Sequence, residues 1–283
     1  MNYRHAFHAG NHADVLKHVL LLALCDALTD KPAACFALDT HAGRGLYRLE
    51  GDEARRSGER AGGIDRLDGG GDPAVARYLR AVAACRRQHG ADAYPGSPWL
   101  LAHALRAHDA IACCELQPEE AAALRAAFRD EPRLHAHLRD GYQAMAALLP
   151  PRAGGTRFDR GLVLVDPPYE AQLDELRTAL AALRAGLARW PTGVFALWYP
   201  VKRGRDLQRF RRAAAGLPAR SALACELTVR PDDSPLRMNG SGLLVLNAPW
   251  RFDAVAGGAL RALDRALGEG GGGAHATWLR APA

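Results

Sequence analysis

The sequence predicts an α/β fold built on a doubly wound parallel sheet, and two observations support this prediction. Short apolar runs, typical of buried parallel strands, alternate along the chain with longer segments of helical periodicity. Four of these runs end at an acidic residue, namely Asp39, Glu115, Asp140 and Asp166. Because parallel strands end at one edge of a sheet, we expect the four side chains to gather there and form a site.

The first expected element is a helix over residues 12–29, for which Asn11 is a suitable N-cap. A strand over residues 34–38 follows and stops at Asp39. The turn over residues 39–45 is rich in small residues, which would let a ligand approach the backbone closely. The first strand is therefore expected to open directly into a binding loop.

The rest of the chain repeats this alternation. The expected elements are a strand over residues 110–114 ending at Glu115, a helix over 118–128, a short segment ending at Asp140, a strand over 162–165 ending at Asp166, a helix over 170–190, a strand over 194–197, and two last strands over 222–229 and 242–246. We expect the last two strands to form an antiparallel hairpin at one edge of the sheet.

The connection between Asp39 and Glu115 holds about 50 residues more than the roughly 30 that a minimal β-α-β unit needs. A charged, Gly-rich stretch and a helical pattern over residues 73–89 predict a helical excursion over the pocket. The expected organisation has four parts: residues 1–46 as the N-terminal segment and first part of the main domain, 47–100 as a helical insertion, 101–267 as the remainder, and 268–283 as a Gly-rich tail. Whether this tail docks on the domain is left open.

Composition limits the function classes. The 283 residues are 48% hydrophobic, enough for one sizeable core, and the formal charge of +6 favours a polyanionic partner. We see no apolar run of the roughly 20 residues that a membrane span needs and no C-x-x-C spacing among the six cysteines. We therefore expect a cytoplasmic monomer without zinc and without a membrane association.

The run Asp166-Pro167-Pro168-Tyr169 carries the most chemical information. The exocyclic amine of adenine is a poor nucleophile, and an enzyme that alkylates it must accept hydrogen bonds from its N–H groups. The Asp166 carboxylate and the carbonyl of Pro167 offer these acceptors on a stiff backbone, and Tyr169 offers a ring on which a base can stack. An ordinary Pro-Pro turn after a strand is the alternative, but the full run favours an adenine-amine site.

The other acidic strand ends are suited to a nucleoside cofactor. One carboxylate at the position of Glu115 can accept both ribose hydroxyls, and Asp140 can accept the amine of an adenine ring. The turn His41-Ala42-Gly43-Arg44-Gly45 is not a complete G-x-G-x-x-G, which disfavours a dinucleotide. The set indicates S-adenosylmethionine.

The chain also resembles a known family. The resemblance rests on six segments, residues 3–18, Asp39 to Gly43, Tyr94 to Pro98, Asp140-Gly141, Asp166 to Tyr169, and Asn239 to Gly242. They are similar to motifs of the RlmJ family of bacterial 23S rRNA adenine-N6 methyltransferases. One departure is the segment from Asn247 to Trp250, where two prolines would be expected.

The resemblance implies a class I S-adenosylmethionine-dependent methyltransferase fold, which is Rossmann-like, with a helical insertion. It implies 23S rRNA as the partner and Asp166 as the catalytic base. It also implies cofactor contacts at His18, His41, Ser97, Glu115, Asp140, Gly141 and Asp166. The residues expected where the target base enters are Tyr3, His5 and Lys17, with Tyr169 beside the base.

Two enzyme alternatives differ in one sequence feature each. A DNA adenine-N6 methyltransferase would share the catalytic run but would usually carry a larger target-recognition region than this insertion. A glutamine-modifying protein methyltransferase would more often have Asn at position 166. A non-catalytic RNA-binding or assembly factor on the same fold would not need Asp166, Glu115 or Asp140, all of which are present.

The N-terminal residues suggest substrate capture. His5, His8, His12 and His18 are spaced unlike any zinc site, so a metal is not expected. Residues 3–8 contain an aromatic ring, an arginine and two histidines, which are suited to stacking on an unpaired base and meeting phosphate. We expect this segment to close over an adenosine extruded from the RNA.

Overall fold

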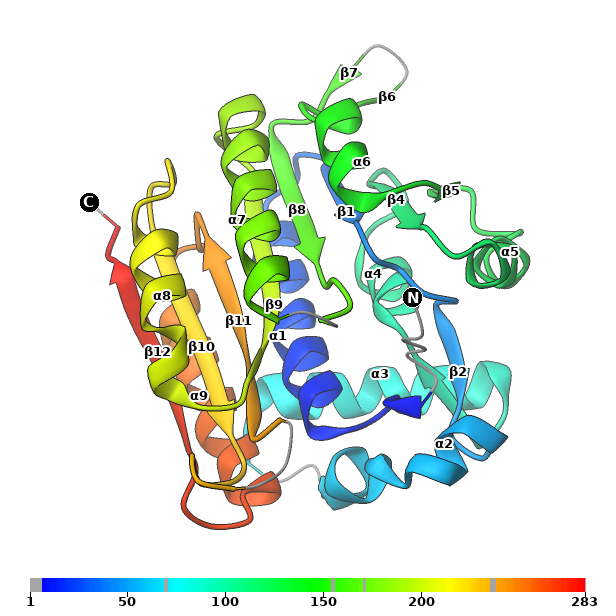
Figure 1. The fold of residues 1–283 in the computed structure, drawn as a ribbon. Helices are drawn as coiled ribbons and strands as arrows, with labels where there is room; N and C mark the ends of the chain where they lie inside the picture. Colours follow the sequence, from blue (N-terminus) through cyan, green and yellow to red (C-terminus); the bar gives the residue numbers. More distant parts are fainter. Residues whose placement is uncertain (1–6, 69–70, 154–155, 170–171, 235–237, 283) are drawn as a thin grey trace.

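The structure is a computed structural model that describes residues 7–68, 71–153, 156–169, 172–234 and 238–282. In these ranges eight strands form one sheet in the order β12-β10-β11-β9-β8-β1-β4-β5 (Figure 1). Their bounds are β1 Cys35–Asp39, β4 Ala110–Glu115, β5 Leu134–Leu138, β8 Arg160–Val165, β9 Val194–Val201, β10 Ala222–Thr228, β11 Gly240–Leu246 and β12 Gly273–Arg280. The predicted α/β fold with a doubly wound sheet is confirmed.

The strands from β9 to β5 all run parallel. β11 reverses this direction, because it pairs antiparallel with β9 on one side and with β10 on the other. The four predicted acidic residues lie at the ends of β1, β4, β5 and β8, at the carboxyl edge of the parallel strands. The sheet thus gathers them in one region, as the sequence predicts.

The predicted edge hairpin is wrong in one respect. β10 and β11 do pair antiparallel, but the edge strand is β12, which pairs with β10. Most residues of β10 are buried, so this strand also needs a neighbour on its side away from β11. The end of the chain supplies the missing strand, and Trp278 of β12 packs against the core. The second half of the Gly-rich tail is therefore part of the sheet.

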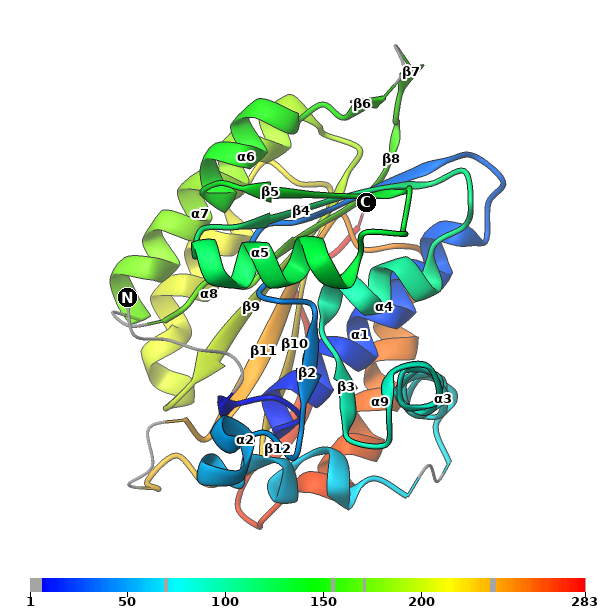
Figure 2. The ribbon, with the colours of Figure 1, turned by 90° about the vertical axis from the view of Figure 1, so that its right-hand side faces the viewer.

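Helices cover both faces of the sheet (Figure 2). One face packs against α1 (His12–Thr29), α3 (Pro73–His89), α4 (Ser97–Ala104), α5 (Pro118–Ala127) and α9 (Phe252–Leu267). The other packs against α6 (Gly141–Leu148), α7 (Gln172–Arg189) and α8 (Gln208–Ala215). Two hydrophobic cores result, one on each side.

Helix α1 is enclosed almost all round, which is unusual for a helix of this kind of domain. It packs against α3, α4, α9 and β11. The polar side chains of its first two turns, His12, Asp14, Lys17 and His18, are all buried, and the rest of the helix is apolar except for Asp26 and Thr29 near its end. Since α1 leads into the start of β1, its own start lies at the opposite, carboxyl edge of the sheet. The polar side chains of its first two turns therefore lie at the site.

The insertion between β1 and β4 contains short helices and a small sheet. Its elements are β2 (Leu46–Arg48), α2 (Asp52–Ser57), the 3-10 helices η2 (Glu59–Gly62) and η3 (Ile64–Arg66), α3, β3 (Ala93–Pro95) and α4. The prediction that its helices lie over the pocket needs correction, because α3 packs beside α1 and α9. Among the described parts of the insertion, β2 and the start of α4 line the first pocket, and η2 and η3 line the second.

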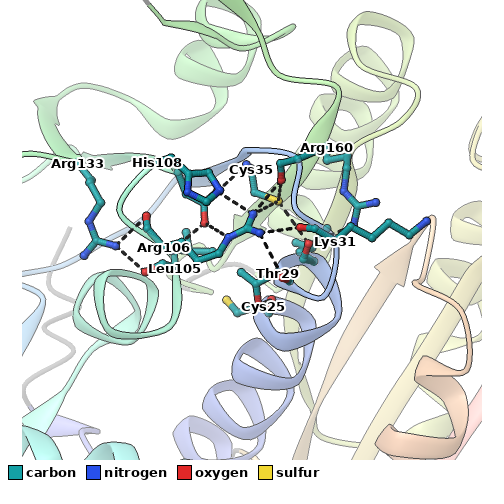
Figure 3. Close-up of polar contacts among 12 residues, drawn as sticks. Cys25, Thr29, Lys31, Cys35, Leu105, Arg106, His108, Arg133 and Arg160 are labelled. Atoms are coloured by element: carbon teal, nitrogen blue, oxygen red, sulfur yellow. Dashed lines mark hydrogen bonds and ion pairs between the residues drawn. The ribbon is translucent and has the colours of Figure 1, made fainter.

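Arg106 fastens the connection between α1 and β1 (Figure 3). Its guanidinium group donates hydrogen bonds to three carbonyl oxygens of that connection, those of Thr29, Lys31 and Ala33, at 3.2, 2.6 and 2.8 Å. It also binds the carboxylate of Asp109 at 3.0 Å, which in turn accepts the N–H of Cys35 at 2.8 Å. Burial would raise the pKa of Asp109, but the hydrogen bonds from Arg106 and Cys35 hold it below its usual value.

Replacing Arg106 by Ala should lower the free energy of unfolding by about 2–4 kcal/mol, because it leaves a buried carboxylate and several carbonyls without their donor. Urea denaturation of the purified variant measures this loss. Arg177→Ala is the matched control, since Arg177 is exposed and pairs with Asp174 one turn away on α7. Equal stability of the two variants would contradict the role of Arg106.

Two further small strands, β6 (Arg152–Ala153) and β7 (Thr156–Arg157), and the 3-10 helix η4 (Gly204–Leu207) complete the described elements. No helix in the described ranges is both long and apolar enough to cross a membrane.

Candidate active site

Two pockets meet at the end of β8. The first has a volume of about 350 Å³ and the second about 850 Å³. Lys17 and Asp166 line both, whereas Pro168 lines only the first and Pro167 and Tyr169 line only the second. The run Asp166-Pro167-Pro168-Tyr169 is therefore a wall between them, and the Asp166 carboxylate is accessible from either side.

Asp166 occupies this position because β8 is a central strand. β8 is paired on both sides, with β1 and β9, and its last five residues are buried. The chain can therefore turn outward only where the strand ends. The Asp166 side chain is 14% exposed, so it is largely shielded from water but still reachable by a ligand.

Lys17 forms an ion pair with Asp166. Its ammonium group lies 2.6 Å from Oδ2 of Asp166 and 3.0 Å from Oδ1 of Asp14, and the Lys17 side chain is only 5% exposed. The backbone N–H of Gly10 donates to the other oxygen of Asp14 at 3.1 Å. This arrangement fixes the position of the Asp166 carboxylate, and it gives Lys17 a contact that was not predicted.

All seven residues expected to contact a cofactor line the first pocket: His18, His41, Ser97, Glu115, Asp140, Gly141 and Asp166. They come from α1, the turn after β1, the start of α4, the end of β4, the start of α6 and the end of β8. The structure thus brings together residues that are far apart in the sequence. Their contact with a cofactor stays a prediction.

Glu115 is held by backbone N–H groups on both carboxylate oxygens. Gly43 donates to Oε2 at 2.9 Å and Gln117 donates to Oε1 at 2.7 Å. Burial raises the pKa of Glu115, and these two hydrogen bonds oppose the rise. The carboxylate is therefore fixed against the turn after β1, and its remaining lone pairs are available to a ligand in the pocket.

His41 is kept neutral by its surroundings. Burial lowers its pKa to about 4, although Asp166 and Asp140 favour the charged form. Its Nδ1 lies 2.8 Å from the hydroxyl of Thr40, and its ring meets the ring of Tyr142 edge-on with centroids 5.2 Å apart. A neutral imidazole does not repel a cationic ligand in the same pocket.

His18 and Ser97 form the inner end of the first pocket. His18 is fully buried, and its Nδ1 lies 3.2 Å from the hydroxyl of Tyr94, which is itself 2.9 Å from the hydroxyl of Tyr78. Ser97 is the first residue of α4 and is 6% exposed. This end of the pocket is thus enclosed by buried polar side chains.

Asp39 comes directly before the turn, and the sequence predicts it at the site as one of four strand-end carboxylates but assigns it no ligand contact. It is fully buried, and its Oδ2 has no hydrogen-bond partner among the described residues. Burial raises its pKa to about 6, against the lowering effect of Ser97 and Lys17. A buried carboxylate oxygen without a donor, next to a pocket, is suited to a ligand donor such as an ammonium group.

An aromatic pair forms one wall of the second pocket. The rings of Tyr169 and Trp198 are 5.5 Å apart and tilted by 58°, and the Tyr169 hydroxyl donates to the carbonyl oxygen of Trp198 at 2.6 Å. The ring of Tyr169 is therefore fixed in place beside Asp166. It offers the flat apolar surface that the sequence predicts.

Several predicted features cannot be compared with the structure. Tyr3 and His5 lie outside the described residues, and their roles at the mouth of the site stay predictions.

Within the described ranges, no group of three or more His, Cys, Asp or Glu side chains is arranged to hold a metal ion. All six cysteines are buried and free.

Sequence reasoning missed most of the second pocket. The missed lining residues are His12, Asp14, Glu59, Arg66, Trp198, Arg230, Met238 and Glu269. A signal existed for Asp14, because an acidic residue three positions before Lys17 on an apolar helix needs a buried partner. For Glu59, Arg230 and Glu269 no local pattern indicates a site, since only the fold brings them to the start of α1.

Comparison with known proteins adds three findings. Residues 31–280 match the sequence family described as "Ribosomal RNA large subunit methyltransferase D, RlmJ". The chain is 37% identical to ribosomal RNA large subunit methyltransferase J of Escherichia coli and 36% identical to the protein of that name from Haemophilus influenzae, with 99% of each chain covered in both cases. The crystal structure of protein LPL1258 from Legionella pneumophila matches with a TM-score of 0.84 and 29% identity, over 98% of this chain and 100% of that one.

Gly141 gives a test of the first pocket's geometry. A Cβ atom there would lie 2.1 Å from the carbonyl oxygen of Thr40 and 2.7 Å from the Thr40 Cβ. Gly141→Ala should therefore push α6 away from the turn after β1 and cost about 1–3 kcal/mol of stability. Thermal denaturation measures this, with Gly257→Ala on α9 as the control, where the new Cβ would meet only the flexible end of Arg261 at 3.4 Å. A fully stable Gly141→Ala variant would show that the two elements are not tightly packed.

Proposed function

Because the chain belongs to the RlmJ family of ribosomal RNA large subunit methyltransferases, we propose that it methylates the N6 amine of one adenine in 23S rRNA. It is an rRNA methyltransferase of EC class 2.1.1 with a class I methyltransferase fold, and its cofactor is S-adenosylmethionine. Beyond methylation of rRNA, we propose that the target is adenine, that its N6 amine receives the methyl group, and that Asp166 binds this amine. The observation that carries it is the Asp166 carboxylate at the junction of two pockets.

The first pocket fits S-adenosylmethionine. Glu115 would accept the ribose hydroxyls and Asp140 the amine of the cofactor's adenine ring. Asp39, next in the chain to the lining residue Thr40, has an oxygen without a partner among the described residues, which would accept the ammonium group of the methionine part. Gly141 allows the start of α6 to approach the turn after β1 closely, since a Cβ there would lie 2.1 Å from the carbonyl oxygen of Thr40. When bound, the cofactor supplies a methyl group on a positively charged sulfur, which the neutral ring of His41 does not repel.

The second pocket would receive the target adenine. Tyr169 would stack on the base, and the Pro167 carbonyl and the Asp166 carboxylate would accept hydrogen bonds from its amine. These acceptors make the nitrogen lone pair more available and stabilise the positive charge that develops on it during transfer. Lys17 holds the carboxylate in position through its 2.6 Å contact. Asp166 is then the acceptor of the proton that the amine loses.

The alternative functions are less well supported. A DNA adenine methyltransferase would share the wall between the pockets, but the curated relatives are named as methyltransferases of ribosomal RNA. A non-catalytic assembly factor would not need a buried ion pair on Asp166 or a pocket lined by Glu115 and Asp140.

We expect the protein to act on its RNA as a monomer in the cytoplasm.

Mapping of rRNA modifications tests the proposed function. Mass spectrometry of 23S rRNA from a strain that lacks the gene should show one adenine without its N6-methyl group. The purified protein with S-adenosylmethionine should restore that group on the deficient RNA. An unchanged modification pattern, or transfer to another atom or to DNA only, would refute the proposal.

Asp166→Asn should lower kcat by about 100-fold or more, because an amide of the same shape lacks the charge that stabilises the cationic amine. Cofactor affinity should remain largely intact, since the ribose and methionine contacts lie elsewhere in the first pocket. Calorimetry and a turnover assay on one preparation separate the two effects. The control is Asp159→Asn, an exposed aspartate before β8, which should not affect either measurement. Near wild-type turnover of Asp166→Asn would exclude the assigned role.

Glu115→Ala should instead weaken cofactor binding, by about 1–3 kcal/mol, the range for losing the partner of buried polar groups. The variant also leaves the N–H groups of Gly43 and Gln117 without their acceptor, so its thermal stability should be recorded alongside. Glu119→Ala, an exposed acid in the first turn of α5, is the matched control. Unchanged affinity of a folded Glu115→Ala variant would move the ribose site elsewhere.

A further inference from the structure

The second pocket extends well beyond the groups that methyl transfer needs. Its volume of about 850 Å³ is more than twice that of the first pocket, which is assigned to a cofactor larger than one adenosine. From Asp166 and Tyr169 it continues past the start of α1 to Glu59 of η2 and Arg230 of the loop after β10. A single target base would leave this far part empty.

His12 lines the far part, and one of its ring nitrogens is left for a ligand. It is 7% exposed, and its Nδ1 has no hydrogen-bond partner among the described residues. Burial and the charge of Arg230 lower its pKa to about 4, against the opposing effects of Glu59 and Glu269. The ring is therefore neutral near pH 7 and offers one donor and one acceptor to a ligand.

Trp198 adds a second polar group without a partner. Its ring packs on Tyr169, and its Nε1 is buried and has no acceptor within the described part of the chain. An indole N–H can only donate, so a ligand atom facing it must be an acceptor. Buried polar atoms are nearly always satisfied in native proteins, and two unsatisfied ones on one pocket wall indicate a polar ligand.

The charged side chains of this pocket are already bound to protein groups. Arg230 binds both carboxylate oxygens of Glu269 at 2.7 and 2.8 Å, and Arg66 donates to the carbonyl oxygens of Leu267 and Gly268. Glu59 accepts from Asn11 at 2.8 Å and lies 3.0 Å from Nδ1 of His8. The groups left for a ligand are neutral donors, acceptors and ring faces, which suit a nucleobase better than a phosphate.

We propose that the second pocket holds two nucleotides of single-stranded RNA, the target adenosine and one adjacent nucleotide, whose base is hydrogen-bonded by His12 and Trp198. This inference rests on the proposed function and names the substrate of the same site more closely. His12 and Trp198 are then specificity-determining residues, and the enzyme reads the base next to its target as well as the target itself. The recognition element is a short unpaired segment, because both bases must leave a duplex to enter the pocket.

The test uses synthetic RNA hairpins that span the adenine mapped in 23S rRNA, in an intact form and with an abasic residue on its 5′ or its 3′ side. For the wild-type protein, one of the two abasic RNAs should lose about tenfold in kcat/KM, the order expected for a lost stack and hydrogen bonds. His12→Ala should lose about tenfold on the intact RNA and show almost no further loss on that abasic RNA. Cofactor affinity should not change.

Two further variants complete the experiment. Trp198→Phe keeps an aromatic ring beside Tyr169 but removes the N–H together with the pyrrole part of the indole, so it reports on the same contact if His12→Ala does not fold. His135→Ala, on the exposed surface of edge strand β5, is the control and should behave as the wild type on all three RNAs.

The outcomes separate this inference from the proposed function. If the wild-type protein does not methylate the intact hairpin or 23S rRNA at adenine, the proposed function fails. If it methylates all three hairpins equally well, the proposed function stands and the adjacent-nucleotide site is refuted. If His12→Ala and Trp198→Phe lose equal activity on intact and abasic RNA, these residues contact the target adenosine alone, which also overturns the inference.

Discussion

The ion pair between Lys17 and Asp166 is the contact on which the site depends. It joins the first helix to the end of a central strand, and both side chains are largely removed from water. A charge in such a place is tolerated only if it is paired, and Lys17 is paired twice, with Asp166 and with Asp14. The position of α1 against β8 therefore decides whether the carboxylate at the junction of the two pockets is correctly held.

Both ends of α1 are fastened by residues from elsewhere in the chain. At its start, Asn11 caps the helix with its side-chain oxygen and binds Glu59 of the insertion with its side-chain nitrogen. At its end, Arg106 holds the carbonyls of the connection to β1. Between these points the apolar residues of α1 are packed into the core. A long insertion thus serves the site indirectly, because η2 anchors the helix that carries Lys17.

The wall between the pockets explains how one fold serves two ligands. Pro168 faces the first pocket while Pro167 and Tyr169 face the second, so a cofactor and a base would approach Asp166 from opposite sides. The first pocket is lined by strand-end carboxylates and by a neutral histidine, which suit a cationic nucleoside. The second is larger and has aromatic and neutral polar walls, which suit bases. The difference in lining separates the two binding tasks without a second domain.

The sequence by itself determined the parallel strands, their acidic ends and the N-cap of α1, because these depend on local periodicity, short turns and residue type. It also placed Glu115, Asp140 and Asp166 at one pocket, since parallel strand ends must meet at one edge, whereas His18, His41 and Ser97 were expected there only from the family resemblance. Only the tertiary structure decided that β12 is the edge strand beside β10. It alone also decided that Glu59, Trp198 and Arg230 line one pocket near the start of α1. Strand pairing and pocket walls of this kind join segments far apart in the chain, and such contacts arise from packing of the whole domain, which no local pattern encodes.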